Sequence, residues 1–596
     1  MLSAPVVYHS RKVNPSLLPF ALADNVYVAN ASPSLSPNRY SAVGVHGSGV
    51  VDGRFVERPS DLRWITEEDH LNLADLGSSI RGSLCLYIWD RSNKELHVLP
   101  DPLGGGLVFR HDDNDGTAVS SDLHSLVVFL LSIGKRPQKS LAYLAEIMAT
   151  GNGGLIPTSY ENIGVIGQFE YFFFAGAGVT VGDYASKTSF FRNDLSADDA
   201  LEALRTEVSD NLRGVASAGH LIKTAHLTGG FDSRLVLAGL KSLGVENDFV
   251  YFCSGRKELP DRQIAEKLSS EFDLTMTEYP GGDLNTSADV FEDNFIKSMR
   301  YSSGIVSGQL MGPVTSPIGG SVILSGGYGE CLRSFYDKSV DREIECTTAE
   351  LAHKLWGNVG FSQDPTESLL ADSLRNRLVS RFGALLEMAS GLGLRSDSQL
   401  DYMYLNVRNR YYVGEVSRQW STDVARFDPL YTLSGPKVAL GLSLADRSAN
   451  ILGFDLMNKL SPDLAHYPFD TPRFNDHYIS LRGTPPMRGF RNGRPPRYDG
   501  RKSLVVGQSA GAAFPKATVV DIEKARLIKA PLRQVAGLEK VRHQCKEMLA
   551  GVPRSELEQS FNYVVLMRLM NAPLNNRMHI RTVYNLYGSL LWYYDS

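Results

Sequence analysis

The segment from residue 221 to residue 240 constrains the fold of this chain more than any other. Residues 221–227 mix β-branched and apolar side chains and predict a buried strand. Residues 235–240 have the apolar spacing of a packed helix. Between them lie residues 228–233, Thr-Gly-Gly-Phe-Asp-Ser, which therefore form a strand-to-helix turn. The segment predicts an α/β unit whose turn leads into the N-terminus of a helix.

The turn has the chemistry of an anion-binding loop. Gly229 and Gly230 carry no Cβ, so their backbone can approach an anion closely. Free N–H groups and the positive end of the helix dipole point at the same place. Thr228 and Ser233 add hydroxyl donors, and Asp232 adds a carboxylate that could hold Mg²⁺ on bound phosphates. We predict a phosphate-binding loop with a metal ligand; the alternative is a purely structural turn.

Composition limits the other classes of function. The chain has 596 residues, of which 43% are hydrophobic and 21% charged, so we expect a globular protein with more than one domain. A net charge of −5 gives no bulk attraction to nucleic acid or to an anionic membrane. Residues 1–5 lack an apolar signal core, and the apolar run at 126–131 is far shorter than the roughly 20 residues that span a bilayer. We expect a cytoplasmic protein with no nucleic-acid or membrane partner.

The cysteines indicate neither a disulfide framework nor a zinc site. Their number is odd and no two form a Cys-x-x-Cys pair. The five positions are Cys85, Cys253, Cys331, Cys346 and Cys545. We expect reduced thiols, most of them buried.

The pattern of secondary structure changes along the chain. Short β-like runs separated by turn residues occupy the first ~185 residues. A capping-box pattern at 196–199 predicts a helix that continues through residue 213. Predicted strands at 250–252 and 322–324 then alternate with a helix at 261–272, which favours a parallel sheet. Beyond about residue 370 the pattern is mainly helical.

One segment is unusually rich in Arg, Gly and Pro. Residues 488–502 read Arg-Gly-Phe-Arg-Asn-Gly-Arg-Pro-Pro-Arg-Tyr-Asp-Gly-Arg-Lys. A solvated surface loop is one interpretation. The other is a mobile basic lid near the phosphates, because the guanidinium group matches phosphate geometry.

Several motifs together resemble one enzyme superfamily. The loop at 228–233 looks like the pyrophosphate loop of the N-type ATP pyrophosphatases, usually Ser-Gly-Gly-x-Asp-Ser, with Thr228 in place of the first serine. Residues 82–90, 99–104 and 119–126 resemble the glutaminase-like domain of asparagine synthetases, and residues 324–333 resemble that family's second nucleotide and metal motif, Ser-Gly-Glu-Gly-x-Asp-Glu. The chain is therefore similar to the asparagine synthetase and β-lactam synthetase superfamily.

This resemblance implies an α/β fold with two domains. Residues 1–190 would form an Ntn-hydrolase-like, β-rich sandwich domain. Residues 191–596 would form a PP-loop ATP pyrophosphatase domain with a parallel sheet and a helical C-terminal part. The implied cofactors are ATP and Mg²⁺. The absence of paired cysteines argues against the tRNA-thiolating relatives.

The resemblance also implies a set of site residues. ATP and pyrophosphate binding is assigned to Leu227, Thr228, Gly229, Gly230, Asp232, Ser233, Phe252, Ser254, Ser325, Gly326 and Gly327, and Mg²⁺ binding to Asp232 and Glu330.

The chain departs from the family at its amino terminus. A working glutaminase of this family has Cys directly after the initiator Met, where the free α-amine activates the thiolate. This chain has Leu2 there, and its first cysteine is Cys85. We expect the fold without the glutaminase chemistry, as in β-lactam synthetases and lasso-peptide cyclases, which use an amine already on their substrate.

The second motif leaves the catalytic base open. Without a gap, Gly327 stands where asparagine synthetases have glutamate and β-lactam synthetases have a catalytic tyrosine. A slide of one residue places Tyr328 at that position and keeps Glu330 at the metal. Tyr328 is then a candidate base, with a buried structural tyrosine as the alternative. Glu415 is a candidate to orient it, with an exposed helix acid as the alternative.

The family's catalytic lysine has no counterpart in register. Lys459 is the first candidate, followed by Arg447 and Lys437, and the alternative for each is a surface charge.

These residues predict an AMP-forming amide ligase that adenylates a carboxylate and couples it to an amine. The substrate would be a small molecule or peptide that carries both groups, closed into a lactam as by a β-lactam synthetase. A lasso-peptide macrolactam cyclase, an intermolecular ligase that uses a free amine or ammonia, and a non-catalytic scaffold are the alternatives. A homodimer is possible.

Overall fold

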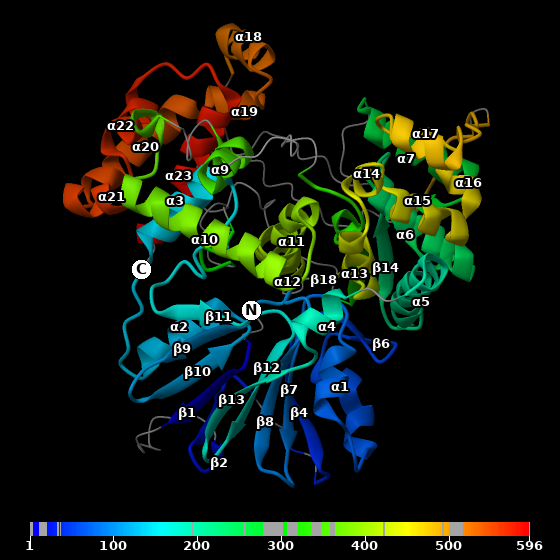
Figure 1. The fold of residues 1–596 in the computed structure, drawn as a ribbon, viewed down its shortest axis with the longest axis horizontal. Helices are drawn as coiled ribbons and strands as arrows, with labels where there is room; N and C mark the ends of the chain where they lie inside the picture. Colours follow the sequence, from blue (N-terminus) through cyan, green and yellow to red (C-terminus); the bar gives the residue numbers. More distant parts are fainter. Residues whose placement is uncertain are drawn as a thin grey trace.

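The computed structural model describes residues 4–10, 21–31, 35, 37–192, 195–253, 258–277, 302–306, 320–336, 347–357, 364–420, 424–491, 494–499 and 517–594. Within these residues the protein is mixed α/β, with antiparallel sheets in the N-terminal part and a parallel sheet after it (Figure 1). This confirms the predicted α/β class at that level.

Two antiparallel sheets form the N-terminal part. The first has the order β11 (Ile163–Val165), β9 (Phe109–Asp112), β10 (Gly116–Ser120), β1 (Val6–Ser10), β3 (Val26–Ala29) and β2 (Ala21–Ala23). The second has the order β13 (Gly178–Asp183), β12 (Glu170–Ala175), β8 (Glu95–Pro100), β7 (Leu84–Asp90) and β4 (Tyr40–Gly47). A short hairpin joins β5 (Gly49–Val51) to β6 (Arg54–Val56).

Both faces of the second sheet are covered. Val7 and Val28 of the first sheet belong to the same buried cluster as Trp89 and Phe172 of the second, so the two sheets share an apolar interior. The opposite face packs against the 3₁₀ helix η2 (Pro59–Glu67) and α1 (Leu73–Ser78). Every residue of β7 is consequently buried.

The parallel sheet contains the predicted phosphate strand. Its order is β18 (Ala425–Phe427), β17 (Ser321–Leu324), β14 (Ile222–His226), β15 (Val250–Phe252), β16 (Thr275–Met276) and β19 (Arg497–Tyr498), with parallel pairing throughout. The strands predicted at 221–227, 250–252 and 322–324 are confirmed, as is the alternation with helices.

Local signals explain where the neighbouring helices begin and end. The side chain of Ser196 accepts a hydrogen bond from the N–H of Asp199 and begins α5 (Ala197–Ala216). The next two helices are α6 (Phe231–Leu243) and α7 (Pro260–Glu271). Gly244 ends α6 with φ 69°, a left-handed conformation that glycine adopts without strain.

The rest of the described chain is mainly helical, as predicted. Its helices are α2 (Leu123–Ser132), α3 (Leu141–Thr150) and α4 (Lys187–Phe191) in the N-terminal part, and later α9 (Thr348–Trp356), α10 (Asp372–Gly391), α11 (Gln399–Asn406), the π-helix η7 (Asn409–Gly414), α12 (Glu415–Trp420), α13 (Ser434–Gly441), α14 (Leu444–Ser448), α15 (Ile451–Leu460), α16 (Pro462–Ala465), α17 (Asp476–Arg482), α18 (Val519–Leu527), α19 (Leu532–Ala536), α20 (Leu538–Ala550), α21 (Arg554–Ser560), α22 (Tyr563–Asn571) and α23 (Arg577–Tyr594). Short 3₁₀ helices lie at η3 (Glu246–Asp248), η4 (Gly329–Leu332), η5 (Pro365–Glu367) and η6 (Ser396–Ser398).

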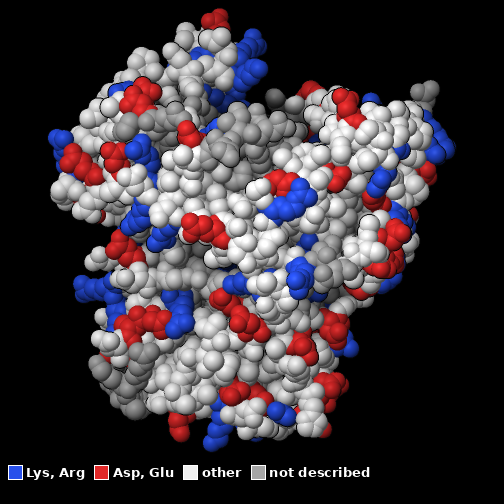
Figure 2. All heavy atoms as spheres, in the orientation of Figure 1, with Lys and Arg blue, Asp and Glu red and all other residues white. Residues whose placement is uncertain are grey.

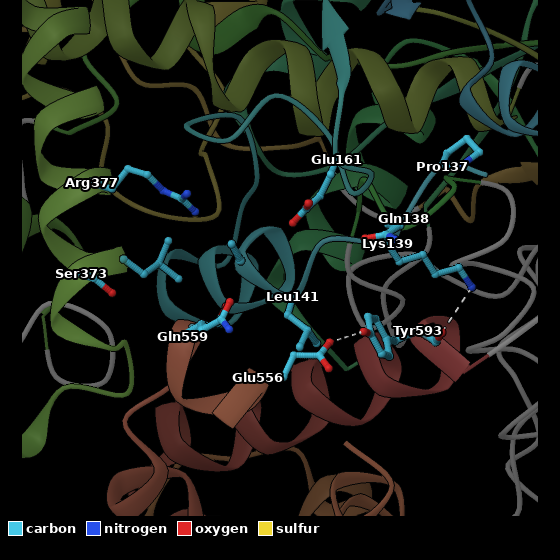
Figure 3. Close-up of a pocket in the computed structure, with 13 residues that line it drawn as sticks. Pro137, Gln138, Lys139, Leu141, Glu161, Ser373, Arg377, Glu556, Gln559 and Tyr593 are labelled. Carbon is cyan, nitrogen blue, oxygen red and sulfur yellow. Dashed lines mark hydrogen bonds between the residues drawn. The ribbon is translucent and has the colours of Figure 1, made fainter. Parts of the chain in front are cut away.

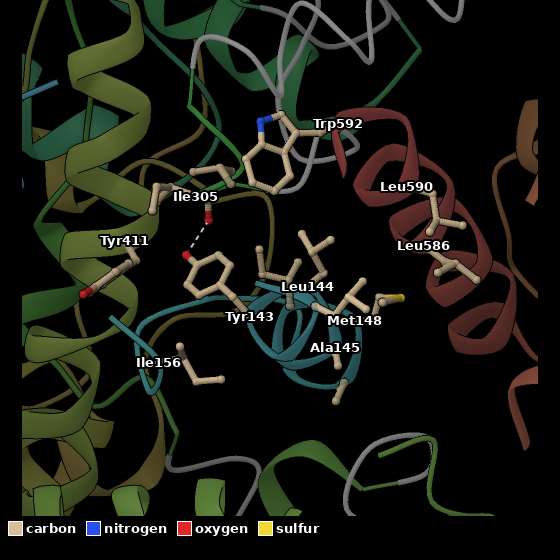
Figure 4. Close-up of a cluster of buried hydrophobic side chains, with 14 of the residues drawn as sticks. Tyr143, Leu144, Ala145, Met148, Ile156, Ile305, Tyr411, Leu586, Leu590 and Trp592 are labelled. Atoms are coloured by element: carbon tan, nitrogen blue, oxygen red, sulfur yellow. Dashed lines mark hydrogen bonds between the residues drawn. The ribbon is translucent and has the colours of Figure 1, made fainter. Parts of the chain in front are cut away.

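The C-terminal helices pack against the N-terminal part. Figure 4 shows Tyr143, Leu144 and Met148 of α3 in one buried cluster with Leu586 and Leu590 of α23. The hydroxyl of Tyr143 donates to the carbonyl oxygen of Ile305 at 2.9 Å. One continuous apolar core therefore joins segments more than 400 residues apart.

No helix within the described residues is long and apolar enough to cross a membrane. Acidic and basic side chains are interspersed on the face seen in Figure 2. Cys85, Cys253, Cys331 and Cys545 are free, as predicted, and Cys346 lies outside the described residues.

Candidate functional site

The predicted phosphate loop lies at the carboxyl end of β14, between β15 and β17 in the sheet. β14 ends at His226, and α6 begins at Phe231 with Gly230 as its N-cap. Ligands of open parallel sheets bind outside the carboxyl ends of the strands. The first-turn N–H groups of α6 also have no carbonyl partner inside the helix. The loop therefore lies where the fold can hold an anion.

Hydroxyl groups and one carboxylate hold the loop in shape. Oγ1 of Thr228 lies 3.0 Å from Oγ of Ser233 and accepts a hydrogen bond from the N–H of Gly230 at 3.0 Å. The N–H of Gly229 donates to the carboxylate of Asp261, at the start of α7, over 2.6 Å. Because these loop amides are already bound, the donors left for an anion are the first-turn amides of α6.

The second motif packs directly on the phosphate loop. A Cβ on Gly326 would lie 2.8 Å from Cβ of Asp232, and one on Gly329 would lie 2.3 Å from Oδ1 of Asp232. Both separations are below 3.0 Å, which Cβ atoms essentially never show. Glycine is therefore required at both positions. The close approach brings Glu330 next to Asp232, as the resemblance implies.

A guanidinium group lies between the two predicted metal ligands. Nη1 and Nη2 of Arg333 are 2.5 and 2.9 Å from the two carboxylate oxygens of Asp232, and Nη2 is 3.6 Å from Oε1 of Glu330. The three side chains are 20, 21 and 29% exposed, respectively, so solvent reaches the cluster. Burial, together with the charge of Asp232, raises the pKa of Glu330.

The donor set fits Mg²⁺ in its chemistry. Mg²⁺ in nucleotide enzymes takes one or two carboxylates and completes its coordination with phosphates and water. Asp232 and Glu330 supply two carboxylates, and the described residues contain no group of three or more acids, histidines or cysteines that could hold a metal without phosphate. Since Arg333 bridges both carboxylates, it must move away from Asp232 when a metal binds there.

Two further residues predicted to bind ATP, Leu227 and Phe252, lie at the same sheet edge. The N–H of Leu227, which is fully buried, donates to the carbonyl oxygen of Phe252 at 2.9 Å. The ring of Phe252 stacks on His226 with centroids 5.0 Å apart. Burial, with a contribution from the charge of Arg426, lowers the pKa of His226 to about 4, so the imidazole is neutral at pH 7. Ser254 lies outside the described residues.

Ser325 and Gly327 are held by the neighbouring strand β18 and the segment that follows it. The Ser325 hydroxyl accepts a hydrogen bond from Nη2 of Arg426 at 2.9 Å. The N–H of Gly327 donates to Oδ1 of Asp428, a buried carboxylate, at 3.1 Å. These contacts anchor the second motif independently of any ligand.

The structure places Tyr328 away from the phosphate loop. Its side chain is 1% exposed, and its ring lies 4.7 Å from that of Tyr431. A Cβ on Gly105, in the N-terminal part, would lie 2.0 Å from the Tyr328 hydroxyl. Within the described residues this hydroxyl has no hydrogen-bond partner, and burial raises its pKa. The position argues against the predicted role as a base and fits the packing alternative.

The structure contradicts the alternative interpretation of Glu415, which was an exposed acid on a helix. Its side chain is fully buried and forms a two-pronged ion pair with Arg418, one hydrogen bond of which measures 2.8 Å. Arg418 is also 3.4 Å from Asp122 of the N-terminal part. Burial and Arg418 lower the pKa of His46, a neighbour in this network, to about 4. Because Arg418 holds it, Glu415 does not orient Tyr328.

The candidates for the family's lysine are also placed elsewhere. Lys459 is exposed on α15 and lies near Glu202 of α5, which contradicts a role at the phosphates. Arg447 is buried rather than exposed, because it binds Asp401 and the hydroxyl of Ser398, each at 2.9 Å. Lys437 is half-buried on α13.

Three described arginines of the basic segment 488–502 contact groups of neighbouring elements rather than the phosphate loop. Arg488 pairs with Asp463 at 2.8 Å, and Arg491 pairs with Glu271 at 3.3 Å. Arg497 lies in β19, where its Nε donates to the Thr275 hydroxyl at 3.0 Å. Part of the segment is thus the edge strand of the parallel sheet, and these arginines favour the surface interpretation over a lid.

A large polar pocket lies apart from the phosphate loop. It has a volume of about 920 Å³, and none of the residues that line it belongs to the predicted site. Figure 3 shows Arg377 and Glu161 on facing sides of this pocket and a hydrogen bond between Glu556 and Tyr593.

Sequence reasoning missed Arg333 and Asp428. Arg333 follows Glu330 by three residues, so its position within one helical turn of a predicted metal ligand was the available signal. Asp428 lies about 100 residues from the glycine that it binds, and no local pattern marks it.

No known protein-family model matches this chain, and no curated protein is found to match it.

Proposed function

We propose that this chain is an ATP-dependent amide ligase that forms AMP and pyrophosphate, similar to the asparagine synthetase and β-lactam synthetase superfamily. In this proposal residues 1–190 are an Ntn-hydrolase-like domain and residues 191–596 are a PP-loop synthetase domain. The observation that carries the proposal is the packing of the second motif on the phosphate loop, which brings Asp232 and Glu330 together at the N-terminus of α6.

In this proposal each group of the site has a separate role. The first-turn amides of α6 and the hydroxyls of Thr228 and Ser233 would hold the pyrophosphate portion of ATP. Asp232 and Glu330 would hold Mg²⁺, which neutralises phosphate charge as pyrophosphate leaves. A carboxylate attacks the α-phosphate to give an acyl-adenylate, and an amine then displaces AMP. Holding the amine beside the adenylate can contribute roughly 7–11 kcal/mol to lowering the barrier.

The N-terminal part would not supply ammonia from glutamine. Leu2 has no nucleophilic atom, and it lies outside the described residues. Cys85 is buried in β7, and burial raises the pKa of its thiol, which disfavours the thiolate. The amine would therefore be on the substrate or free in solution. Incubation with glutamine and ATP should release no glutamate above background.

Two measurements test the proposal: binding of α,β-methylene-ATP with Mg²⁺, and ATP–pyrophosphate exchange with a panel of amino acids. Asp232→Asn and Glu330→Gln should abolish both. The matched controls Asp210→Asn and Glu387→Gln, on exposed helix positions, should change neither. Near wild-type exchange in Asp232→Asn would show that the metal site is wrong. Nucleotide binding without exchange for any acid in the wild type would favour the scaffold alternative.

A further inference from the structure

A cavity beside the metal carboxylates is lined mainly by aromatic and apolar side chains. Its volume is about 220 Å³. The apolar part of the lining is Leu155, Phe335, Tyr336, Leu355, Trp356 and Val407. Phe335 is 38% exposed, which is unusual for a phenylalanine among so many rings. The cavity thus presents an accessible aromatic surface.

Two residues that line the cavity come directly after the second motif in the sequence. Phe335 and Tyr336 come two and three residues after Arg333, the side chain that contacts Asp232. The ring of Phe335 lies 4.5 Å from that of Tyr404. Tyr404 in turn lines a small cavity together with Glu330 and Arg333. A ligand in the cavity beside Phe335 would therefore lie next to the groups proposed to hold the phosphates.

Other cavities fit an acyl substrate less well. The one lined by Glu330, Cys331 and Arg333 has a volume of about 10 Å³, room for no more than a water molecule. The pocket of about 920 Å³ in Figure 3 has no lining residue in the predicted site.

Arg408 supplies a charge suited to a carboxylate. Its guanidinium lies 5.2 Å from the ring centroid of Phe335 and 4.7 Å from that of Tyr412. Stacking of this kind fixes the guanidinium plane and leaves its edge donors directed outward. Within the described residues Arg408 forms no ion pair. Its guanidinium can therefore pair with an incoming carboxylate.

The polar part of the lining comes largely from the N-terminal part. It contains Glu146 and Thr150 of α3, with Asn152 after the helix. Glu146 is fixed there because its two carboxylate oxygens accept hydrogen bonds from the N–H groups of Leu155 and Ile156, each at 2.8 Å. Glu146 therefore shapes the cavity wall, while Arg408 supplies its cation.

We propose that this cavity binds the carboxylate substrate of the ligase, and that the substrate is a small amino acid with one aromatic or branched apolar side chain. This inference rests on the proposed function. The volume, below the roughly 300–1,000 Å³ typical of drug-sized ligands, admits one such side chain and excludes a peptide loop. Arg408 positions the carboxylate, and the rings enclose the side chain.

Ligand-detected saturation-transfer NMR on the full chain, without ATP, tests the binding. The probes are phenylalanine, 3-amino-3-phenylpropanoate and leucine, compared with aspartate and serine. The apolar probes should bind and the polar ones should not. Arg408→Gln should weaken binding by about 10- to 100-fold, because a hydrogen-bonded charge is lost. Arg408→Lys should weaken it less. Arg205→Gln, a change on the exposed surface of α5, should leave it unchanged.

ATP–pyrophosphate exchange with the same probes separates the two proposals. Exchange with aspartate or serine alone, together with their binding in the wild type, would overturn the cavity assignment and leave the ligase intact. Binding of phenylalanine that depends on Arg408, without exchange for any acid, would sustain the cavity and overturn the ligase. Equal binding of all five probes, unaffected by Arg408→Gln in a variant whose thermal unfolding is unchanged, would also reject the cavity.

Discussion

Replacement of Arg333 by glutamine should tighten the binding of Mg²⁺ with nucleotide. In the structure the Arg333 guanidinium bridges Asp232 and Glu330, the two carboxylates proposed to hold the metal. Metal and guanidinium therefore compete for the same oxygens. The metal can bind Asp232 only after the ion pair has broken, so removal of the guanidinium should favour the metal-bound state.

The geometry sets the size of the effect. A hydrogen-bonded pair with a charged partner contributes about 1.5–3 kcal/mol when buried, and the bidentate contact to Asp232 is of this kind. Both side chains are about one fifth exposed, so solvent screening reduces this to about 1–2 kcal/mol. At about 1.36 kcal/mol per factor of ten, the Mg²⁺ midpoint should fall by about 5- to 30-fold.

The assay is a Mg²⁺ titration of α,β-methylene-ATP binding. Arg333→Lys keeps the charge but loses the bidentate geometry, so its midpoint should lie between those of the wild type and Arg333→Gln. Arg205→Gln, which breaks an exposed ion pair with Glu202 on α5, should leave the midpoint unchanged. If the midpoint of Arg333→Gln equals or exceeds that of the wild type, the guanidinium does not compete with the metal.

Three further predictions concern buried groups. Tyr328→Phe should leave pyrophosphate exchange and product formation unchanged and should not lower the thermal unfolding temperature, because the buried hydroxyl has no partner to lose. Slow product formation with normal exchange would instead restore Tyr328 as a base. Glu415→Gln should lower the free energy of unfolding by about 3–5 kcal/mol in urea titrations, because it leaves Arg418 buried without its closest opposite charge. The exposed control Glu387→Gln should have no effect. Equal stabilities of the two variants would contradict this. Burial raises the pKa of Glu146 from 4.5 to about 8, so between these values the folded chain keeps a proton that the unfolded chain has released. The free energy of unfolding should therefore fall as the pH rises from about 5 towards 8. An unaltered pH profile of thermal unfolding in Glu146→Gln would refute the assignment.

Local pattern predicted the α/β unit well. The strands at 222–226, 250–252 and 321–324 and the helix at 197–216 follow from side-chain periodicity and from the Ser196 cap. These signals lie within a few residues of the elements that they specify. The family resemblance implied that the two motifs lie side by side. The structure shows that this contact requires glycine at position 326, because a Cβ there would clash with Asp232.

Non-local contacts account for the site residues that the sequence misplaced. Glu415 is buried because Arg418 also reaches Asp122, about 300 residues away, and no helical periodicity contains that partner. Tyr328 adopts φ 68° at the start of η4, and the turn directs its ring at Tyr431 rather than at the phosphate loop. Lys459 lies on the exposed side of α15 near Glu202 of α5, so it stays at the surface.

Hydrogen bonds of buried charged side chains join the N-terminal part to the rest of the protein. The buried carboxylate of Asp101 accepts hydrogen bonds from the N–H of Gly105 at 2.9 Å and from the hydroxyl of Tyr431 at 2.6 Å. Arg410, in the π-helix η7, donates to the carbonyl oxygens of Gly104 and Ile166 at 3.0 and 2.6 Å. Separating the two parts would break the contacts of Asp101 with Tyr431 and of Arg410 with the two carbonyl oxygens, and a buried charge that loses its partners is strongly destabilising. These contacts hold the segments after the second motif and around η7 in place from the side of the N-terminal part, a structural role that requires no catalytic residue there.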